Sequence, residues 1–275
     1  MFCALFVPTV PAATEIAEVR HVIDGDTLVL ANGKHVRLIG INAPEVGHSC
    51  QPRPATRGAV TSSRFGKDCT PTPDQPLARD ARAQLTNLVR RRQVTLSFEH
   101  ERQDRYGRLL AHVLLADGQS VEEILLRQGL AWVVAIPPNV EQLNRLQAAE
   151  QEARARQTGI WNEPAYKPIP AERLMPKSTG FYLIEGTVQA WRLRHQVIYF
   201  DLAPGVTLVV PNEDWKKYFE VQGRTNVAKD RMSRTTAGKP SDLTGRRVVA
   251  RGWLTEYKGG LHMRVPHPAM LTLLN

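Results

Sequence analysis

Three short clusters of charged residues lie where predicted strands meet loops, and they carry the chemistry of a metal and phosphate site. The clusters are Asp24–Thr27, Arg37–Glu45 and Asp104–Arg108. A carboxylate, an amide oxygen and a backbone carbonyl from such strand ends form an all-oxygen site that suits a hard cation such as Ca²⁺. Two arginines from separate strands can donate to one phosphate group, and a glutamate can hold an attacking water.

Each cluster also has an ordinary structural interpretation when it is taken singly. Asp-Gly pairs are common in turns, Pro44-Glu45 suits an exposed strand end, and Tyr106-Gly107 suits a hairpin. The chemical interpretation therefore depends on all three clusters occurring together.

The surrounding pattern predicts a β-meander with helices. Asn32-Gly33 predicts a tight hairpin, and Ser120 with Glu123 forms a capping box. The predicted strands are Glu18–Ile23, Thr27–Ala31, Lys34–Ile41, Val94–His100 and Leu109–Ala116, and the predicted helices are Leu77–Arg92, Val121–Gln128 and Glu141–Gln157. Five strands and three helices suit a small β-barrel with helices packed around it, which is an α+β fold dominated by β-structure.

A second set of strands follows a proline-rich connector at residues 164–178. The predicted elements are the strands Tyr182–Ala190, Val197–Leu202, Val206–Val210, Arg247–Thr255 and Leu261–Val265, with a short helix near Glu213–Val221. Their order is that of an oligonucleotide-binding (OB) fold, although order alone leaves other small barrels open. We therefore expect a first domain at 14–163, with an insertion at 46–76, and an OB-like domain at 179–275.

From Ala17 to Trp161 the chain resembles the staphylococcal nuclease (thermonuclease) family. The resemblance is carried by the three clusters in this order, by Arg127–Ala131 (RQGLA) and by Gly159–Trp161 (GIW). It implies a calcium-dependent phosphodiesterase acting on DNA or RNA, built on a five-stranded OB-fold barrel. The second domain resembles, less specifically, the small barrel appended to some bacterial thermonuclease-like proteins.

The resemblance also assigns roles to individual residues. Asp26, Asn42 and the Ala43 carbonyl are placed at the metal, Glu45 at the attacking water, and Arg37 and Arg108 on the phosphate. Position 42 departs from the pattern, because the family has Asp where this chain has Asn. Losing one ligand charge predicts a weaker calcium site.

Residues expected to contact the nucleic acid occur in both domains. Arg105 and Tyr106 lie in the third cluster, whereas the second domain interleaves aromatic and basic side chains that could stack on bases and follow the backbone. The members of that second set are Trp191, Arg192, Arg194, Tyr199, Arg251 and Trp253. A competing interpretation places part of these aromatic side chains in the hydrophobic core.

The overall composition is that of an ordinary globular protein with a basic surplus. The chain has 275 residues and a net charge of +9, and residues 180–275 hold 14 Lys and Arg against 8 Asp and Glu. A basic second half attracts polyanions, nucleic acid first among them. No apolar run after the first residues reaches the length of a membrane span.

The N-terminal segment and two cysteines suggest export. Residues 1–13 are apolar from Phe2 to Val10 and close on Ala12 and Ala13, like the core and cleavage site of a secretory signal, but they lack a basic start. Cys50 and Cys69 are expected to form a disulfide in an oxidising compartment. We therefore expect a periplasmic or secreted protein.

Three functions remain open at this point. The first is a calcium-dependent nuclease whose basic second domain captures substrate. The second is a nucleic-acid-binding protein that keeps the nuclease fold but has lost metal-dependent cleavage through Asn42. The third is a scaffold whose insertion and second barrel bind a protein partner.

Overall fold

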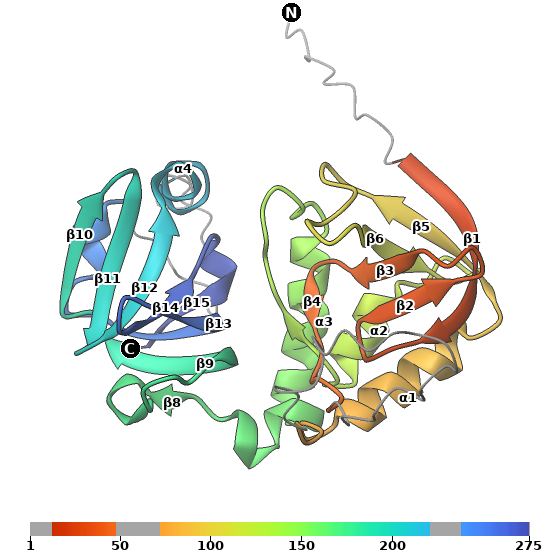
Figure 1. Cartoon of the computed structure of the whole chain (residues 1–275), viewed down its shortest axis with the longest axis horizontal. Coiled ribbons are helices and arrows are strands. Elements are labelled where there is room, and N and C mark those ends of the chain that lie inside the picture. The colour runs from red at the N-terminus through yellow and green to blue at the C-terminus, as the bar shows by residue number, and fades with distance from the viewer. Residues whose placement is uncertain (1–12, 48–71, 221–237, 275) are drawn as a thin grey trace, which may run out of the picture.

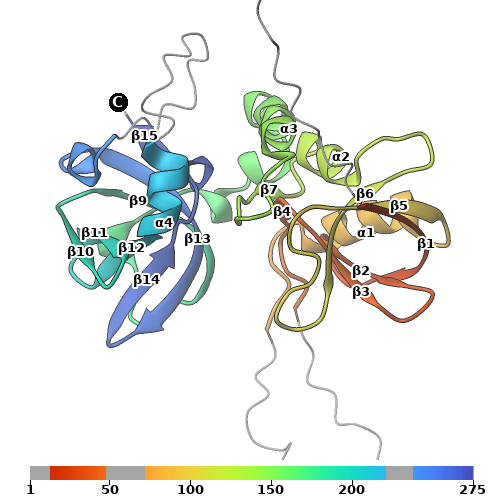
Figure 2. The same cartoon turned by 90° about the horizontal axis from the view of Figure 1, so that it is seen from above.

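The computed structural model describes residues 13–47, 72–220 and 238–274. It comprises two β-rich halves that lie side by side, joined by the connector around residues 164–178 (Figures 1 and 2). Cys50 and Cys69, most of the insertion and residues 1–12 lie outside the described residues, so the predicted disulfide and leader stay predictions. In the part of the chain that is described, no helix has the length and apolar character needed to cross a membrane.

The first half is a closed five-stranded barrel with three helices, which confirms the predicted α+β class. Around the barrel the strands are β1 (Ala13–Val22), β2 (Thr27–Leu30), β3 (His35–Leu38), β6 (Leu109–Leu114) and β5 (Gln93–Phe98). Strict alternation explains their placement: in β5, Val94, Leu96 and Phe98 are buried while the residues between them are not. The barrel core is therefore encoded by period-two patterning.

Three helices cover this barrel: α1 (Ala78–Val89), α2 (Val121–Arg127) and α3 (Leu143–Ala155). Helix α2 begins where Ser120 accepts a hydrogen bond from the Glu123 amide at 3.2 Å, as the capping box predicts. Gly129 and Gly159 let two backbones approach closely, because Ile160 N donates to Gly129 O at 2.8 Å and a Cβ on either glycine would clash. This contact joins the RQGLA and GIW segments.

One predicted strand is wrong in its extent. The run Lys34–Ile41 is split into β3 and the short strand β4 (Ile41–Asn42), because Gly40 adopts a positive φ of 80° between them. Strand β4 leaves the barrel and pairs with β7 (Trp132–Val133), where Asn42 lies opposite Trp132. The break directs Asn42 away from the barrel wall.

The second half is an eight-stranded sheet that curves strongly in Figure 1. Its strands are β8 (Ile169–Pro170), β9 (Gly180–Thr187), β10 (Ala190–Arg194), β11 (Val197–Ala203), β12 (Val206–Pro211), β13 (Arg247–Tyr257), β14 (Gly260–Arg264) and β15 (Leu271–Leu274). The predicted helix begins at α4 (Asn212–Asp214) and continues as a π-helical segment, Trp215–Phe219. The classification of this half as OB-like stays a prediction.

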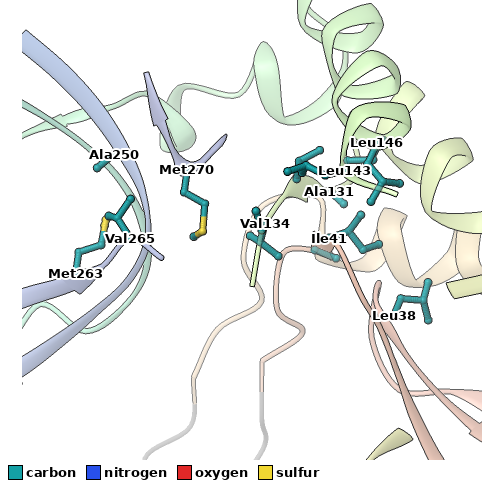
Figure 3. Close-up of a cluster of buried hydrophobic side chains, with 14 of the residues drawn as sticks. Leu38, Ile41, Ala131, Val134, Leu143, Leu146, Ala250, Met263, Val265 and Met270 are labelled. Carbon is teal, nitrogen blue, oxygen red and sulfur yellow. The ribbon is translucent and has the colours of Figure 1, made fainter. Parts of the chain in front are cut away.

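The two halves share an apolar and aromatic contact. Trp132 packs against Tyr166 of the connector at 4.6 Å and against Phe181 of β9 at 5.1 Å, and Phe181 packs against Trp253 at 5.2 Å between ring centroids. Figure 3 shows the side chain of Met270, from the second half, extending toward Val134 of the first half. The buried side chains of both halves consequently form one continuous cluster.

A buried ion pair crosses the same contact. Arg251 Nη1 lies 2.5 Å from Glu150 Oε1, with the side chains only 12% and 6% exposed. The same Glu150 oxygen accepts a hydrogen bond from Val133 N at 2.7 Å, and Arg251 Nη2 donates to Ala269 O at 3.2 Å. This network connects helix α3, strand β7 and the second half.

Replacing Arg251 by Ala should lower the free energy of unfolding by about 3 kcal/mol, because it leaves the Glu150 carboxylate buried without its cation. Arg247→Ala is the matched control: Arg247 lies on the same strand and pairs with Glu185, but its side chain is 63% exposed, so we expect a loss below about 1 kcal/mol. Urea unfolding of both variants measures the difference. Equal losses of unfolding free energy in the two variants would show that the buried Glu150 carboxylate does not need Arg251 as its counter-ion.

Candidate active site

The first cluster forms a tight loop between β1 and β2. Asp24 accepts a hydrogen bond from Asp26 N at 3.1 Å. Gly25 fits because a Cβ there would lie 2.5 Å from Ala43 Cβ and 2.6 Å from Ala81 Cβ. The glycine thus allows the loop to close against both the end of β4 and helix α1.

Asp26 is the centre of this loop and is buried. Its Oδ2 accepts a hydrogen bond from Ala43 N at 2.7 Å and forms an ion pair with Arg37, while Thr27 Oγ1 donates to Oδ1 at 3.1 Å. Arg37 is well placed for this pair because it lies opposite Thr27 in the β2–β3 register. The fold therefore joins the first two clusters directly.

Arg37 also joins Asp26 to Asn42. Its Nη2 donates to Asn42 Oδ1 at 3.1 Å, and Asn42 is as deeply buried as Asp26. The Asn42 amide is also 3.5 Å from the Ala43 carbonyl. All three residues predicted to hold a metal lie together, with one guanidinium contacting two of them.

Glu45 lies at the exposed rim of this group. Its backbone is held by Gln75, because Glu45 N donates to Gln75 Oε1 at 2.8 Å and Gln75 N donates to Glu45 O at 3.0 Å. Negative charge gathers here: burial, followed by the charge of Asp26 and more weakly that of Glu45, raises the pKa of Asp24 to about 7. An excess of carboxylate charge is what an added cation would neutralise.

Arg108 lies in its own turn. Its Nε donates to Asp104 Oδ2 at 2.7 Å, and Asp104 Oδ1 accepts hydrogen bonds from Tyr106 N and Arg108 N. The parallel pairing of β3 with β6 puts Val36 opposite Leu109, so Arg108 comes just before the strand that adjoins Arg37. The topology brings both arginines to neighbouring strands, while Tyr106 projects into solvent with its side chain 71% exposed.

The donor chemistry of this site suits a hard cation. Asp26, Asn42 and the Ala43 carbonyl supply only oxygen donors, and Asp24 and Glu45 add nearby negative charge. Among the described residues, no three Asp, Glu, His or Cys side chains gather as a ready metal cluster.

The residues predicted to bind substrate in the second half are separated by the structure. Arg192 lies opposite Tyr199 on one face of the β10–β11 hairpin, and Trp191 lies opposite the buried Phe200 on the other. Arg194 ends β10 and is exposed. Arg251 lies at the contact between the halves, whereas Trp253 packs against Phe181 of its own half and is partly exposed.

Sequence reasoning gave no role to three residues that shape the site. Asp24 belongs to the DGDT motif, and its pairing with Asp26 at two-residue spacing was the available signal. Gln75 lies outside every motif, and Trp132 pairs with Asn42 only through tertiary structure. No local pattern could have identified the last two.

Asp24→Asn should stabilise the protein at pH 8 in EDTA. Because the folded-state pKa is raised, the folded protein holds a proton that the unfolded chain releases between about pH 4 and pH 7, so stability falls as pH rises through this window. Asparagine keeps the acceptor without the charge, and we expect a gain of roughly 2 kcal/mol at pH 8 that vanishes near pH 4. Asp117→Asn, at an exposed turn, should give no gain, and an equal gain there would contradict the assignment.

Comparison with known proteins agrees with this geometry. Residues 35–163 match the family model described as staphylococcal nuclease homologue. Endonuclease YncB of Bacillus subtilis (strain 168) is 34% identical over 149 residues, which cover 52% of this chain and 60% of that protein. SPbeta prophage-derived endonuclease YokF of the same organism is also 34% identical, with 43% of its length covered.

A third relative is covered more fully. Thermonuclease of Staphylococcus intermedius is 31% identical over 146 residues, which cover 52% of this chain and 74% of that protein. The match to the first two relatives spans less than two thirds of their lengths. With the barrel, the three clusters and this coverage in agreement, the chain belongs to the staphylococcal nuclease family.

Proposed function

We propose that this protein hydrolyses phosphodiester bonds of DNA or RNA with the help of a calcium ion. The observation that carries the proposal is the grouping of Asp26, Arg37 and Asn42 beside Glu45, in a chain of the nuclease family. Asp26, Asn42 and the Ala43 carbonyl would hold the ion. When bound, calcium would supply positive charge to the scissile phosphate.

Glu45 would orient the attacking water and accept its proton. The water oxygen forms a bond to phosphorus, the bond from phosphorus to the leaving sugar oxygen breaks, and that oxygen takes a proton from solvent. Arg37 and Arg108 would stabilise the charge that develops on the phosphate oxygens. Once Asp26 and Asn42 hold the cation, Arg37 would no longer contact these two side chains. Its guanidinium would donate to the phosphate oxygens instead.

Arg108 is prepared for the same task by Asp104. The bond to Asp104 uses the Nε group, so the side chain is oriented while the terminal amino groups are the donors that would reach a phosphate. The exposed Tyr106 would add a contact to the nucleic-acid strand. The Arg105 guanidinium lies 4.8 Å from the Tyr106 ring centroid. The basic second half would hold the rest of the substrate.

A second candidate function follows from Asn42. A site with Asp26 as its only carboxylate ligand would bind calcium weakly, and the protein would then bind nucleic acid without cleaving it. Activity on single-stranded DNA over a calcium titration distinguishes the two functions. We also retain export, with a Cys50–Cys69 disulfide, as a proposal that rests on the sequence alone.

Glu45→Gln, Arg37→Ala and Arg108→Ala should each reduce kcat by about 10²–10³, because each removes a group that acts on the transition state. Lys34→Gln is the control, since Lys34 is exposed in the β2–β3 turn. Steady-state cleavage of a fluorescent oligonucleotide measures the loss, and circular dichroism confirms folding. Parental rates in all three variants would mean that the site is elsewhere.

Asn42→Asp should tighten calcium binding and lower the calcium concentration for half-maximal activity, because it restores a second carboxylate ligand. The variant keeps the oxygen that accepts a hydrogen bond from Arg37 Nη2. Calorimetric titration with calcium measures the affinity. Equal affinities, or no heat from either protein, would favour the binding-protein function.

A further inference from the structure

A cavity of about 510 Å³ opens on the second half, in the part of the chain beyond the family match. Its lining includes Arg192, Asp201, Thr207, Tyr257, Lys258 and His262. Asp201, Thr207 and His262 form one row across β11, β12 and β14, because Asp201 pairs with Thr207 and Thr207 with His262. The floor of the cavity is therefore a rigid sheet.

Aromatic rings form one wall of this cavity. Tyr257, which is 54% exposed, and His262 form this wall, with ring centroids 5.3 Å apart. Tyr199 is not part of the lining, and its ring centroid lies 6.2 Å from that of His262. Burial, followed by the charge of Arg192, lowers the pKa of His262, so its ring is neutral at neutral pH. The wall offers flat uncharged surfaces to a ligand ring.

Positive charge flanks these rings. The Lys258 ammonium is 5.3 Å from the Tyr257 ring centroid, and the Arg192 guanidinium is 5.0 Å from that of Tyr199. The one acid in the lining, Asp201, is already engaged, because it pairs with Arg192 and accepts a hydrogen bond from Thr207 Oγ1 at 2.8 Å. With two cations and one paired acid, the cavity favours an anionic ligand.

We propose that this cavity binds one nucleotide of a single-stranded nucleic acid, with the base against Tyr257 and His262 and the backbone phosphate near Arg192 and Lys258. The choice of a nucleic acid rests on the proposed function, whereas the site is separate from the candidate active site. Ring surfaces beside cations are the arrangement that binds unpaired bases without sequence preference. A paired base inside a duplex cannot present its face to such a wall, and the volume falls in the usual range for ligand sites.

The test measures binding of the full chain to a fluorescent oligothymidylate by anisotropy in EDTA, where metal-dependent cleavage is absent. Tyr257→Ala should raise Kd about tenfold at every salt concentration, because it removes a stacking surface. Lys258→Gln should weaken binding most at low salt and reduce the slope of log Kd against log salt by about 0.7, as expected for one lost phosphate contact.

Two control variants match these changes. Leu193→Ala removes another exposed apolar side chain, 51% exposed, which lies on the face of the β10–β11 hairpin opposite to Arg192. Lys177→Gln removes an exposed lysine that, like Lys258, has a positive φ, 71° against 51°. Both controls should bind as the parent does.

Three results would overturn the proposal: equal effects of the cavity variants and their controls, equal affinity for a duplex of the same length, or no binding by the parent. The outcome is independent of the nuclease proposal. A parent that cleaves nothing with any divalent cation, but whose binding is weakened by Tyr257→Ala, would refute the nuclease function and support the cavity. A parent that cleaves, but whose cavity variants bind oligothymidylate as the parent does, would support the nuclease function and refute the cavity proposal.

Discussion

The carboxylate of Glu150 is the point on which the arrangement of the two halves depends. One oxygen accepts from the backbone of Val133 and from the guanidinium of Arg251. A buried carboxylate is tolerated only when it is paired and hydrogen-bonded, so both partners must remain in place. Because Val133 belongs to β7, and β7 pairs with β4, the second half supports the strand that carries Asn42.

Much of the barrel could be predicted because its signals are local. Alternation in β5 and the Ser120 cap of α2 each act over a few residues. The β10–β11 hairpin was missed because its turn residues, His195 and Gln196, take positive φ values of 47° and 61° without the usual glycine or asparagine. Strands β4 and β7 have two residues each, and only tertiary pairing creates them.

In the candidate site, too, local sequence signals identified the residues, and only tertiary structure showed how they contact one another. Sequence identified Asp26, Arg37 and Asn42, but it placed Arg37 only on the phosphate, whereas the fold has Arg37 contacting both predicted metal ligands. In the second half, composition could not distinguish a binding face from an internal contact. Arg251 has the residue type of a nucleic-acid surface, yet it pairs with Glu150 where the halves meet.

Trp132 bears on how this protein can be divided. Its ring is covered by Tyr166 and Phe181, and it stands opposite Asn42 in the β4–β7 pair. The family match ends at residue 163, which invites treating the first half as a detachable cassette. Cut there, that half would expose the Trp132 indole and leave the Glu150 carboxylate without Arg251, next to the strand that carries Asn42. A first half of this chain that is to stand alone would therefore need replacements at Trp132 and Glu150.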